Sequence, residues 1–258
     1  MSPPQAGPFI LDLDSPHATL EQVGGKGASL ARLAAAGLPV PAGFHITTAA
    51  YRRHVDENHL RDSILSAVAQ AGAPAALDRA SVQIQSLIGN GTIPTDIAAM
   101  IRQRYEDLGP DAAAAVRSSG TAEDLPGMSF AGQLETYLNV RGGDEVIDAV
   151  KRCWASLWTA RAIAYRQRQG IRPEDIGIAV VVQRLVPAQV AGVVFTVNPV
   201  SRPLLVLILF AKCPCAGRVG HGREAVMDRC LSSCHTSSAS RGPAGRAAKH
   251  ARFGRERW

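Results

Sequence analysis

The feature that most constrains this chain is the stretch from Ala115 to Val140, which joins a buried-strand pattern, a loop and a second strand. Four alanines and a valine lead into Arg117, and small and acidic residues with Gly120, Gly127 and Gly132 follow it. Such a strand–loop–strand unit holds a cation and many free backbone N–H groups over one spot. Proteins bind polyphosphate in this way, so the stretch predicts an anion site.

Two interpretations of Arg117 remain open at this point. Its guanidinium is either a phosphate ligand or one half of a structural ion pair with Glu123 or Asp124. The strand after the loop alternates, with Glu135 and Tyr137 on one face. Its other face is expected to carry Leu134, Thr136, Leu138 and Val140.

A second candidate anion site is the run Gly24–Gly27, which contains Lys26 and opens a helical pattern. Free N–H groups, the positive end of a helix and a mobile ammonium all favour an anion. The spacing is not that of a Walker A loop, and an ordinary tight turn is the alternative interpretation. Leu30 and Leu33 lie on one side of this helix, and Gly37 is expected to end it.

The segments between these two candidate sites have apolar patterns typical of core-packing elements and no motif that indicates catalysis or binding. A turn and a short strand are expected over residues 40–47, with Thr47 or Thr48 capping the next helix. Apolar residues that recur every three or four positions predict helices at 64–71, 77–88 and 95–108. The histidines have no carboxylate or cysteine cluster at metal spacing, so solvated or core positions are expected for His45, His54 and His59.

The segment from Asp144 to Gln169 has the pattern of one long amphipathic helix, which Gly170 ends. Cys153 is expected to be a buried apolar group, because no base lies near it in sequence. We expect Arg161 and Arg166 to be solvated, with contact to a phosphate as the lesser alternative.

Residues 178–186 form a nearly continuous apolar strand, interrupted at Gln183 and Arg184. A second strand at residues 192–197 follows a turn, so a hairpin of the two is expected. The amide of Gln183 needs a hydrogen-bond partner inside such a strand. A nucleotide or a neighbouring backbone group would supply one.

Charge and cysteine content change sharply after Ser201. The chain has a net charge of +6, but residues 202–258 alone carry +8, which leaves −2 for the part before them. Four of the five cysteines also lie in this tail. The tail beyond the apolar run 204–210 lacks helix or strand periodicity, so disorder is expected, or a reading frame shifted within the gene.

The composition of the tail suggests two further functions that we consider weaker. Its positive charge could contact nucleic acid. Cys213 and Cys215, with Cys230, Cys234 and His235, could suggest zinc, but these spacings are atypical and chance cysteines are favoured. No apolar run reaches the roughly 20 residues that a membrane span needs, and no signal peptide is evident, so a cytoplasmic location is expected.

Four ordered motifs resemble the ATP-binding domain of the phosphoenolpyruvate synthase, pyruvate phosphate dikinase and rifampicin phosphotransferase family. They occupy residues 23–48, 115–133, 153–162 and 192–201, and the resemblance covers about residues 9 to 201. It implies an α+β, ATP-grasp-like fold, incomplete at its C-terminal end, with ATP and Mg²⁺ as ligands. The domains expected are a partial ATP-binding domain at residues 1–201 and the tail at 202–258.

The resemblance also assigns roles to particular residues. By matching position, Lys26 and Arg117 would bind the phosphates, Gly132 and Thr136 would line the phosphate loop, and Gln183 would face the nucleotide. The family transfers the β-phosphoryl group of ATP to a histidine on a separate domain, which then phosphorylates pyruvate or another acceptor. No residues after Ser201 match the family's Mg²⁺-binding glutamate or its final strand, so a truncated chain, inactive alone, is expected.

The alternative is a non-catalytic nucleotide-binding remnant, or a partner module for a separately encoded phosphohistidine or acceptor domain. Antibiotic phosphorylation of the rifampicin phosphotransferase kind is the less favoured activity within the family. The sequence leaves the phosphoryl acceptor open.

Overall fold

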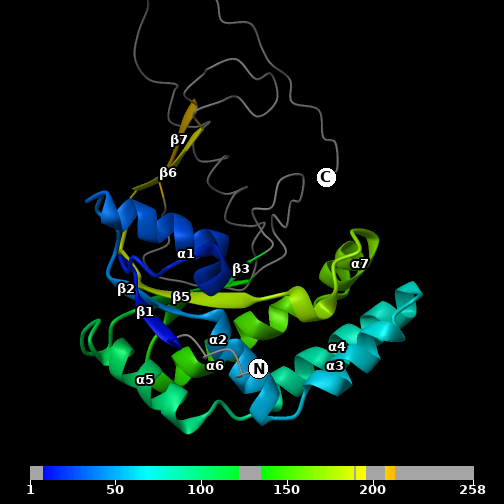
Figure 1. The fold of residues 1–258 in the computed structure, drawn as a ribbon. Helices are drawn as coiled ribbons and strands as arrows, with labels where there is room; N and C mark the ends of the chain where they lie inside the picture. Colours follow the sequence, from blue (N-terminus) through cyan, green and yellow to red (C-terminus); the bar gives the residue numbers. More distant parts are fainter. Residues whose placement is uncertain (1–7, 122–134, 189, 196–206, 213–258) are drawn as a thin grey trace, which may run out of the picture. The chain divides into compact units, whose positions relative to one another are not determined.

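A computed structural model describes residues 8–121, 135–188, 190–195 and 207–212 (Figure 1). The chain divides into two compact units, Met1–Val186 and Pro187–Trp258. The first unit mixes helices with one sheet, so the expected α+β class is confirmed.

The sheet of the first unit has five strands in the order β1-β2-β5-β3-β4, and every neighbouring pair is antiparallel. β5 lies at its centre because it is the most continuously apolar strand, buried from Ile178 to Gln183. The strands are β1 (Ile10–Asp12), β2 (Gly43–Ile46), β3 (Ala114–Gly120), β4 (Thr136–Val140) and β5 (Ile178–Arg184).

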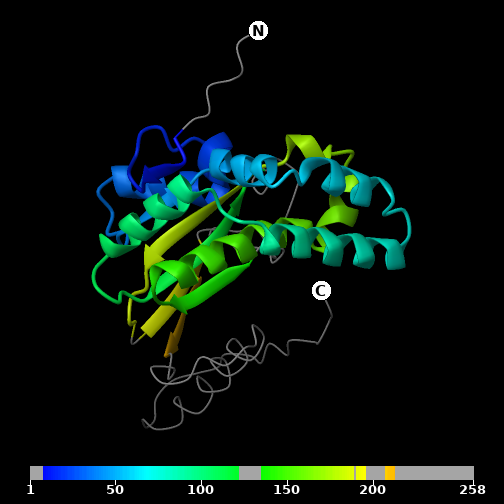
Figure 2. The same cartoon turned by 90° about the horizontal axis from the view of Figure 1, so that it is seen from below.

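Helix α1 (Leu20–Ala35) covers one face of this sheet, and the other helices lie on the opposite side (Figures 1 and 2). The α-helices of that layer are α2 (Thr48–Glu57), α3 (Arg61–Ala69), α4 (Pro74–Asn90), α5 (Thr95–Glu106), α6 (Gly143–Ala155) and α7 (Ala160–Arg168). Of these, α2, α5 and α6 contact the strands. The short 3₁₀ helices η1 (Ser156–Trp158) and η2 (Pro173–Asp175) complete the unit. The three helices expected at 64–71, 77–88 and 95–108 are thus confirmed as α3, α4 and α5.

The hydrophobic core lies between the sheet and the helical layer. Alternate residues of β3 and β5, including Val116, Val180 and Val182, point into it. Trp154 of α6 is the largest fully buried side chain among the described residues, and the ring of His54 lies 5.0 Å from its ring. Burial of this many aliphatic side chains, each worth about 1.5–3 kcal/mol, makes this layer the main source of stability.

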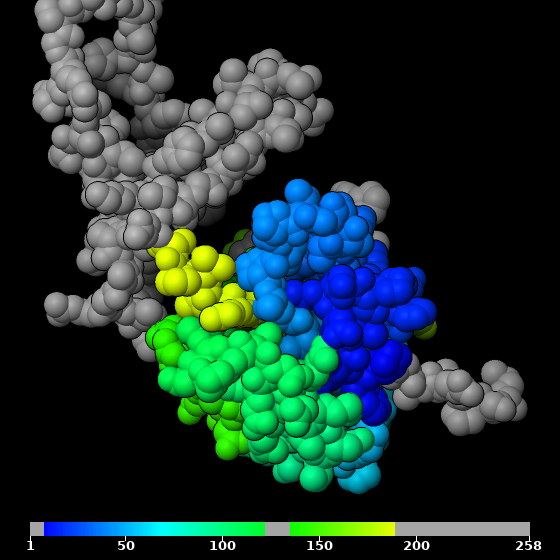
Figure 3. All heavy atoms as spheres, turned by 90° about the vertical axis from the view of Figure 1, so that its left-hand side faces the viewer, coloured from blue at the N-terminus to red at the C-terminus, as the bar shows by residue number. Residues whose placement is uncertain are grey.

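The end of β5 is held from both sides by backbone hydrogen bonds. Arg184 N donates to Ala42 O at 2.8 Å, and Leu185 N donates to Ala113 O at 2.7 Å. In Figure 3 the yellow surface of this segment accordingly lies beside blue N-terminal residues and the green region that includes α5.

The expected single helix from Asp144 to Gln169 is wrong, because the chain turns at Thr159. That residue has an extended backbone with φ −65° and ψ 149°, and its hydroxyl accepts a hydrogen bond from Ala162 N, which caps α7. The segment therefore divides into α6, η1 and α7. Gly170, with φ 66°, follows the end of α7 as expected.

The regular alternation expected in β4 is also wrong. Arg117 pairs with Thr136, yet Ala114 pairs with Val140, so the register shifts by one residue. Asn139 has a positive φ of 59°, and Leu138 is 54% exposed. A β-bulge of this kind breaks the two-residue period. Tyr137 and Val140 therefore both pack on the hydrophobic core.

The second unit contains β6 (Val190–Phe195) and β7 (Leu207–Lys212), which pair with each other antiparallel. The hairpin expected between residues 178–186 and 192–197 is therefore wrong, because β5 already has β2 and β3 as neighbours. β7 also places a strand inside the predicted tail. The domain boundary at Ser201 falls outside the described residues and stays a prediction.

Candidate functional site

Three of the predicted site residues share one face of the five-stranded sheet. The β-ladder pairs Arg117 with Thr136 on one side and with Val181 on the other. Gln183 lies two residues beyond Val181 on β5, so its side chain points to the same face. Directly opposed and diagonal neighbours on one sheet face have Cβ atoms within about 8 Å of each other, so these three side chains form one cluster.

Helix α1 brings Lys26 to the same region. Its Nζ donates a hydrogen bond of 3.3 Å to the backbone oxygen of Ser118, the residue after Arg117. The two candidate phosphate cations, 91 residues apart in sequence, thus come from a helix and a strand that contact each other.

The glycine run allows α1 to pack closely against β3. Gly24 has φ 69° and ψ 176°, so the regular helix starts after it. A Cβ added to Gly24 would lie 2.3 Å from Ser119 O, which no side chain tolerates. Gly27 N donates to Ser119 Oγ at 3.0 Å. Small residues here allow the close approach, and the buried face of α1 is built from Val23, Gly27 and Ala31 rather than from the leucines.

Arg117 is half-buried and differs from most arginines of the unit. Among the residues that the structure describes, its guanidinium has no hydrogen-bond or ion-pair partner. The alternative partners, Glu123 and Asp124, lie outside those residues, as does Gly132. A cation held within a sheet face beside a second cation provides an electrostatic environment suited to a polyanion.

Gln183 has the backbone partner that its burial requires. The side chain is 6% exposed, and its Nε2 donates to Pro41 O at 3.3 Å. Of the two partners expected for this amide, the structure thus provides the neighbouring backbone group.

Two residues of this face were not identified from sequence. Ser119 receives the Gly27 hydrogen bond and is fully buried. His45 pairs with Val181, which places it in one cross-strand row with Arg117 and Thr136. The sequence could have identified these two residues through the polar residues at alternate positions of apolar strands, because such residues share one face of a sheet.

His45 is fully buried beside α1, and its Nδ1 has no hydrogen-bond partner within the described part of the chain. Its Nε2 lies 3.4 Å from Leu13 O. Burial lowers the pKa of His45, because desolvation penalises the imidazolium more than the Leu13 carbonyl stabilises it. His54 is likewise buried with a lowered pKa, and His59 is exposed, as expected for core and solvated histidines.

Arg161 is exposed as expected, but the expectation of a solvated Arg166 is wrong. Arg166 is only 3% exposed, donates to Leu157 O at 2.6 Å and lies 5.0 Å over the Trp158 ring. Desolvation lowers its pKa to about 10. Cys153 is fully buried, and burial raises the pKa of its thiol, so it is not a poised nucleophile.

No group of three or more His, Cys, Asp or Glu side chains suited to a metal ion occurs among the described residues. Within the same residues, none of the helices is both long and apolar enough to cross a membrane.

The comparisons with known proteins now define the class. Residues 20–211 match the family described as pyruvate phosphate dikinase, AMP/ATP-binding domain. The match covers well over half of the chain, so the chain belongs to this family and is a dikinase-type ATP-binding domain. The matched region continues past Ser201, where the resemblance was expected to end.

The relatives include phosphoenolpyruvate synthases and a rifampicin phosphotransferase. The chain is 45% identical over 190 residues to the phosphoenolpyruvate synthase of Aeropyrum pernix, covering 70% of this chain and 23% of that protein. It is 39% identical over 218 residues to the phosphoenolpyruvate synthase of Pyrococcus furiosus, covering 69% and 27%. It is 42% identical over 200 residues to the rifampicin phosphotransferase of a Streptomyces species, covering 76% and 23%. The chain thus spans about a quarter of the length of these relatives.

Proposed function

We propose that the first unit binds ATP with its phosphates against the sheet face that carries Arg117, Thr136 and Gln183. Lys26 and Arg117 would neutralise phosphate oxygens, and the Thr136 hydroxyl and the Gly132 loop would donate hydrogen bonds to them. The observation that supports this most is the contact of Lys26 with the strand of Arg117, at 3.3 Å from Nζ to Ser118 O. An ATP-grasp type of nucleotide site is part of this proposal.

Mg²⁺ fits the proposal as a companion of the nucleotide. This ion keeps several waters and binds through substrate phosphates and one or two carboxylates, so a cluster of three protein ligands is not needed. When bound, it would offset the phosphate charge that the two cations leave.

The activity proposed for the complete protein is a dikinase-type phosphoryl transfer. In this scheme the β-phosphoryl group of ATP passes to a histidine on a separate domain and from there to an acceptor, for which phosphoenolpyruvate synthesis from pyruvate is the favoured reaction. Lys26 and Arg117 would hold the phosphates in line and stabilise charge on the transferred group. The same two residues would therefore serve binding and transfer. We also propose a cytoplasmic location.

Calorimetric titration of the chain with Mg-ATP tests the nucleotide site. We expect saturable binding that weakens at least about tenfold in Lys26→Ala and in Arg117→Ala, since a charge-assisted hydrogen bond contributes about 1.5–3 kcal/mol. Arg79→Ala, an exposed arginine on α4, is the matched control and should bind normally. Absence of binding by the folded chain, or equal affinity in all three variants, would contradict the proposal.

A further inference from the structure

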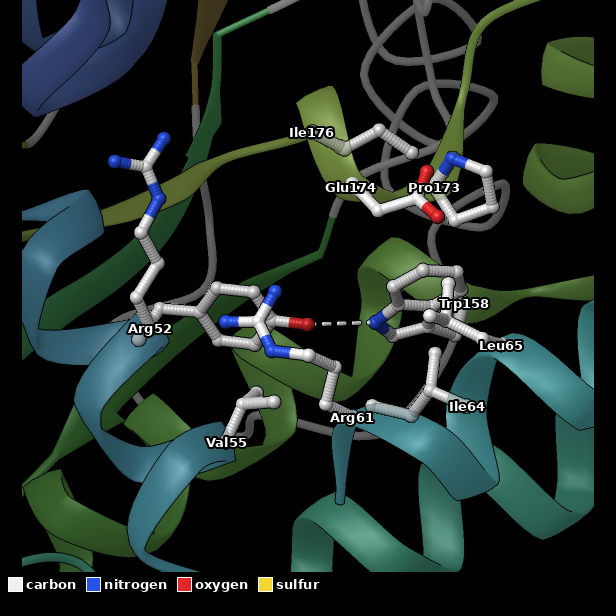
Figure 4. A pocket seen from close by; sticks show the side chains of 10 residues that line it. Arg52, Val55, Arg61, Ile64, Leu65, Trp158, Pro173, Glu174 and Ile176 are labelled. Carbon is white, nitrogen blue, oxygen red and sulfur yellow. Dashed lines mark hydrogen bonds between the residues drawn. The ribbon is translucent and has the colours of Figure 1, made fainter. Parts of the chain in front are cut away.

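A pocket of about 120 Å³ lies in the helical layer, away from the sheet face described above (Figure 4). It opens between α2, α3, η1 and η2. Its apolar walls include Val55, Ile64 and Ile176, and its polar groups come from Tyr51, Arg52, Arg61, Trp158 and Glu174.

The buried polar groups of this pocket are arranged as donors. Trp158 Nε1 donates to Tyr51 Oη at 2.8 Å, and both side chains are less than 5% exposed. The Tyr51 hydroxyl therefore accepts one hydrogen bond, and its own proton has no acceptor among the described residues. Burial raises the pKa of Tyr51 to about 12, so the hydroxyl keeps that proton at neutral pH. A buried O–H without an acceptor favours an incoming oxygen ligand.

Charge around the pocket favours an anion. Arg52 has no hydrogen-bond or ion-pair partner in the described part of the chain, and Arg61 is paired with Asp56 at 2.7 Å. The buried Arg166 guanidinium lies 5.0 Å over the ring of Trp158, which lines the pocket, and it has no carboxylate partner among the described residues. Glu174 on the rim is the one carboxylate among the described residues that line the pocket.

We propose that this pocket binds a small carboxylate with an apolar body. The carboxylate would accept hydrogen bonds from the Tyr51 hydroxyl and the Arg61 guanidinium, which is a donor with fixed planar geometry suited to carboxylates. The apolar body would contact Val55, Ile64 and Ile176. The site is separate from the proposed nucleotide site, because it is built from the helices that lie on the opposite side of the sheet.

Calorimetric titration of the full chain with 3-methylbutanoate tests the proposal. We expect one saturable site, with 3-methylbutanamide and acetate each at least about tenfold weaker, because one lacks the charge and the other the apolar body. Arg61→Gln should weaken binding about tenfold, and Arg79→Gln on α4 should leave it unchanged. Saturating Mg-ATP should not displace the carboxylate.

Tyr51→Phe should also weaken binding, but it removes the acceptor of a buried indole N–H and is expected to lower stability. Arg61→Gln changes an exposed side chain and is therefore the decisive variant. The melting temperature of each variant should be measured alongside its affinity. The proposal is overturned by absence of binding, by equal affinity for the amide, by unchanged affinity in Arg61→Gln, or by competition with Mg-ATP. Failure of the nucleotide proposal would leave these outcomes unaffected.

Discussion

The backbone amide of Gly27 donates a hydrogen bond of 3.0 Å to the Ser119 hydroxyl, which joins the start of α1 to the end of β3. This contact, together with that of Lys26 and Ser118, determines where the ammonium of Lys26 lies relative to Arg117. Neither serine needs to touch a ligand for this purpose. The glycine run at residues 24–27 and the arginine–serine–serine run at residues 117–119 thus form one structural unit.

Replacing Ser119 by Ala should weaken both the fold and nucleotide binding. The substitution leaves the buried Gly27 N–H without its acceptor, which costs about 1–3 kcal/mol. Thermal unfolding should show a lowered melting temperature, and calorimetry a weaker Mg-ATP affinity. Ser66→Ala, at an exposed serine on α3, is the control and should change stability by less than about 0.5 kcal/mol. Wild-type behaviour of Ser119→Ala would mean that the contact does not stabilise the α1–β3 junction.

Replacing Gly24 by Ala should be among the most damaging single changes in the first unit. The position combines a φ of 69° with a Cβ site 2.3 Å from Ser119 O, so both strain and collision oppose the new methyl group. We expect a loss of more than about 2 kcal/mol, measured as a fall in melting temperature. Gly72→Ala provides the comparison, because no atom lies within 4 Å of its Cβ site. Similar effects at the two positions would refute the close-packing explanation.

The hydroxyl of Thr136 should contribute to phosphate binding rather than to stability. Thr136 lies directly opposite Arg117 on the shared sheet face and is half-buried. Thr136→Val keeps the shape and the strand preference, so we expect an unchanged melting temperature and a roughly tenfold weaker Mg-ATP affinity by calorimetry. Thr95→Val, at an exposed position of α5, should alter neither quantity. A Thr136→Val protein with full affinity would remove this residue from the proposed site.

Stability should decrease as the pH falls below neutrality. Desolvation lowers the pKa of His45 and of His54 in the folded chain, so the unfolded chain binds more protons below about pH 6.5. Each histidine can then reduce the free energy of unfolding by at most about 1.4 kcal/mol per pH unit. The free energy of unfolding should therefore be lower at pH 5.5 than at pH 7.5.

The His45→Gln substitution should reduce this pH dependence. His17→Gln, at an exposed histidine, serves as its control and should preserve the dependence. If the free energy of unfolding of His45→Gln changes with pH as steeply as that of the wild type, the His45 imidazole does not cause the pH dependence.

Sequence patterns predicted most elements of the first unit but not their interruptions. Periodicity located α3, α4 and α5, because their apolar residues recur at helical spacing over several turns. It missed the turn at Thr159, where one extended residue and its hydroxyl cap divide an otherwise continuous amphipathic pattern. It missed the bulge near Asn139 for a similar reason, since a single positive φ shifts the register without changing the residue types.

Long-range pairing was the other source of error. The apolar run 178–186 and the strand after it are close in sequence, which favours a hairpin, but β5 is the central strand and bonds to β2 and β3 on its two sides. Burial of Arg166 was missed because its partners, the Leu157 carbonyl and the Trp158 ring, become available only where η1 turns back on α7.

The sequence alone determined the family and the residue types of the proposed site, because glycines, lysine, arginine and serines occur in ordered motifs that demand particular backbone geometry. Only the tertiary structure placed Lys26 against the strand of Arg117, and His45 in one row with Arg117 and Thr136. These relationships depend on strand order, register and the fit of α1 on β3. Those features arise from contacts between residues far apart in sequence, which local patterns do not encode.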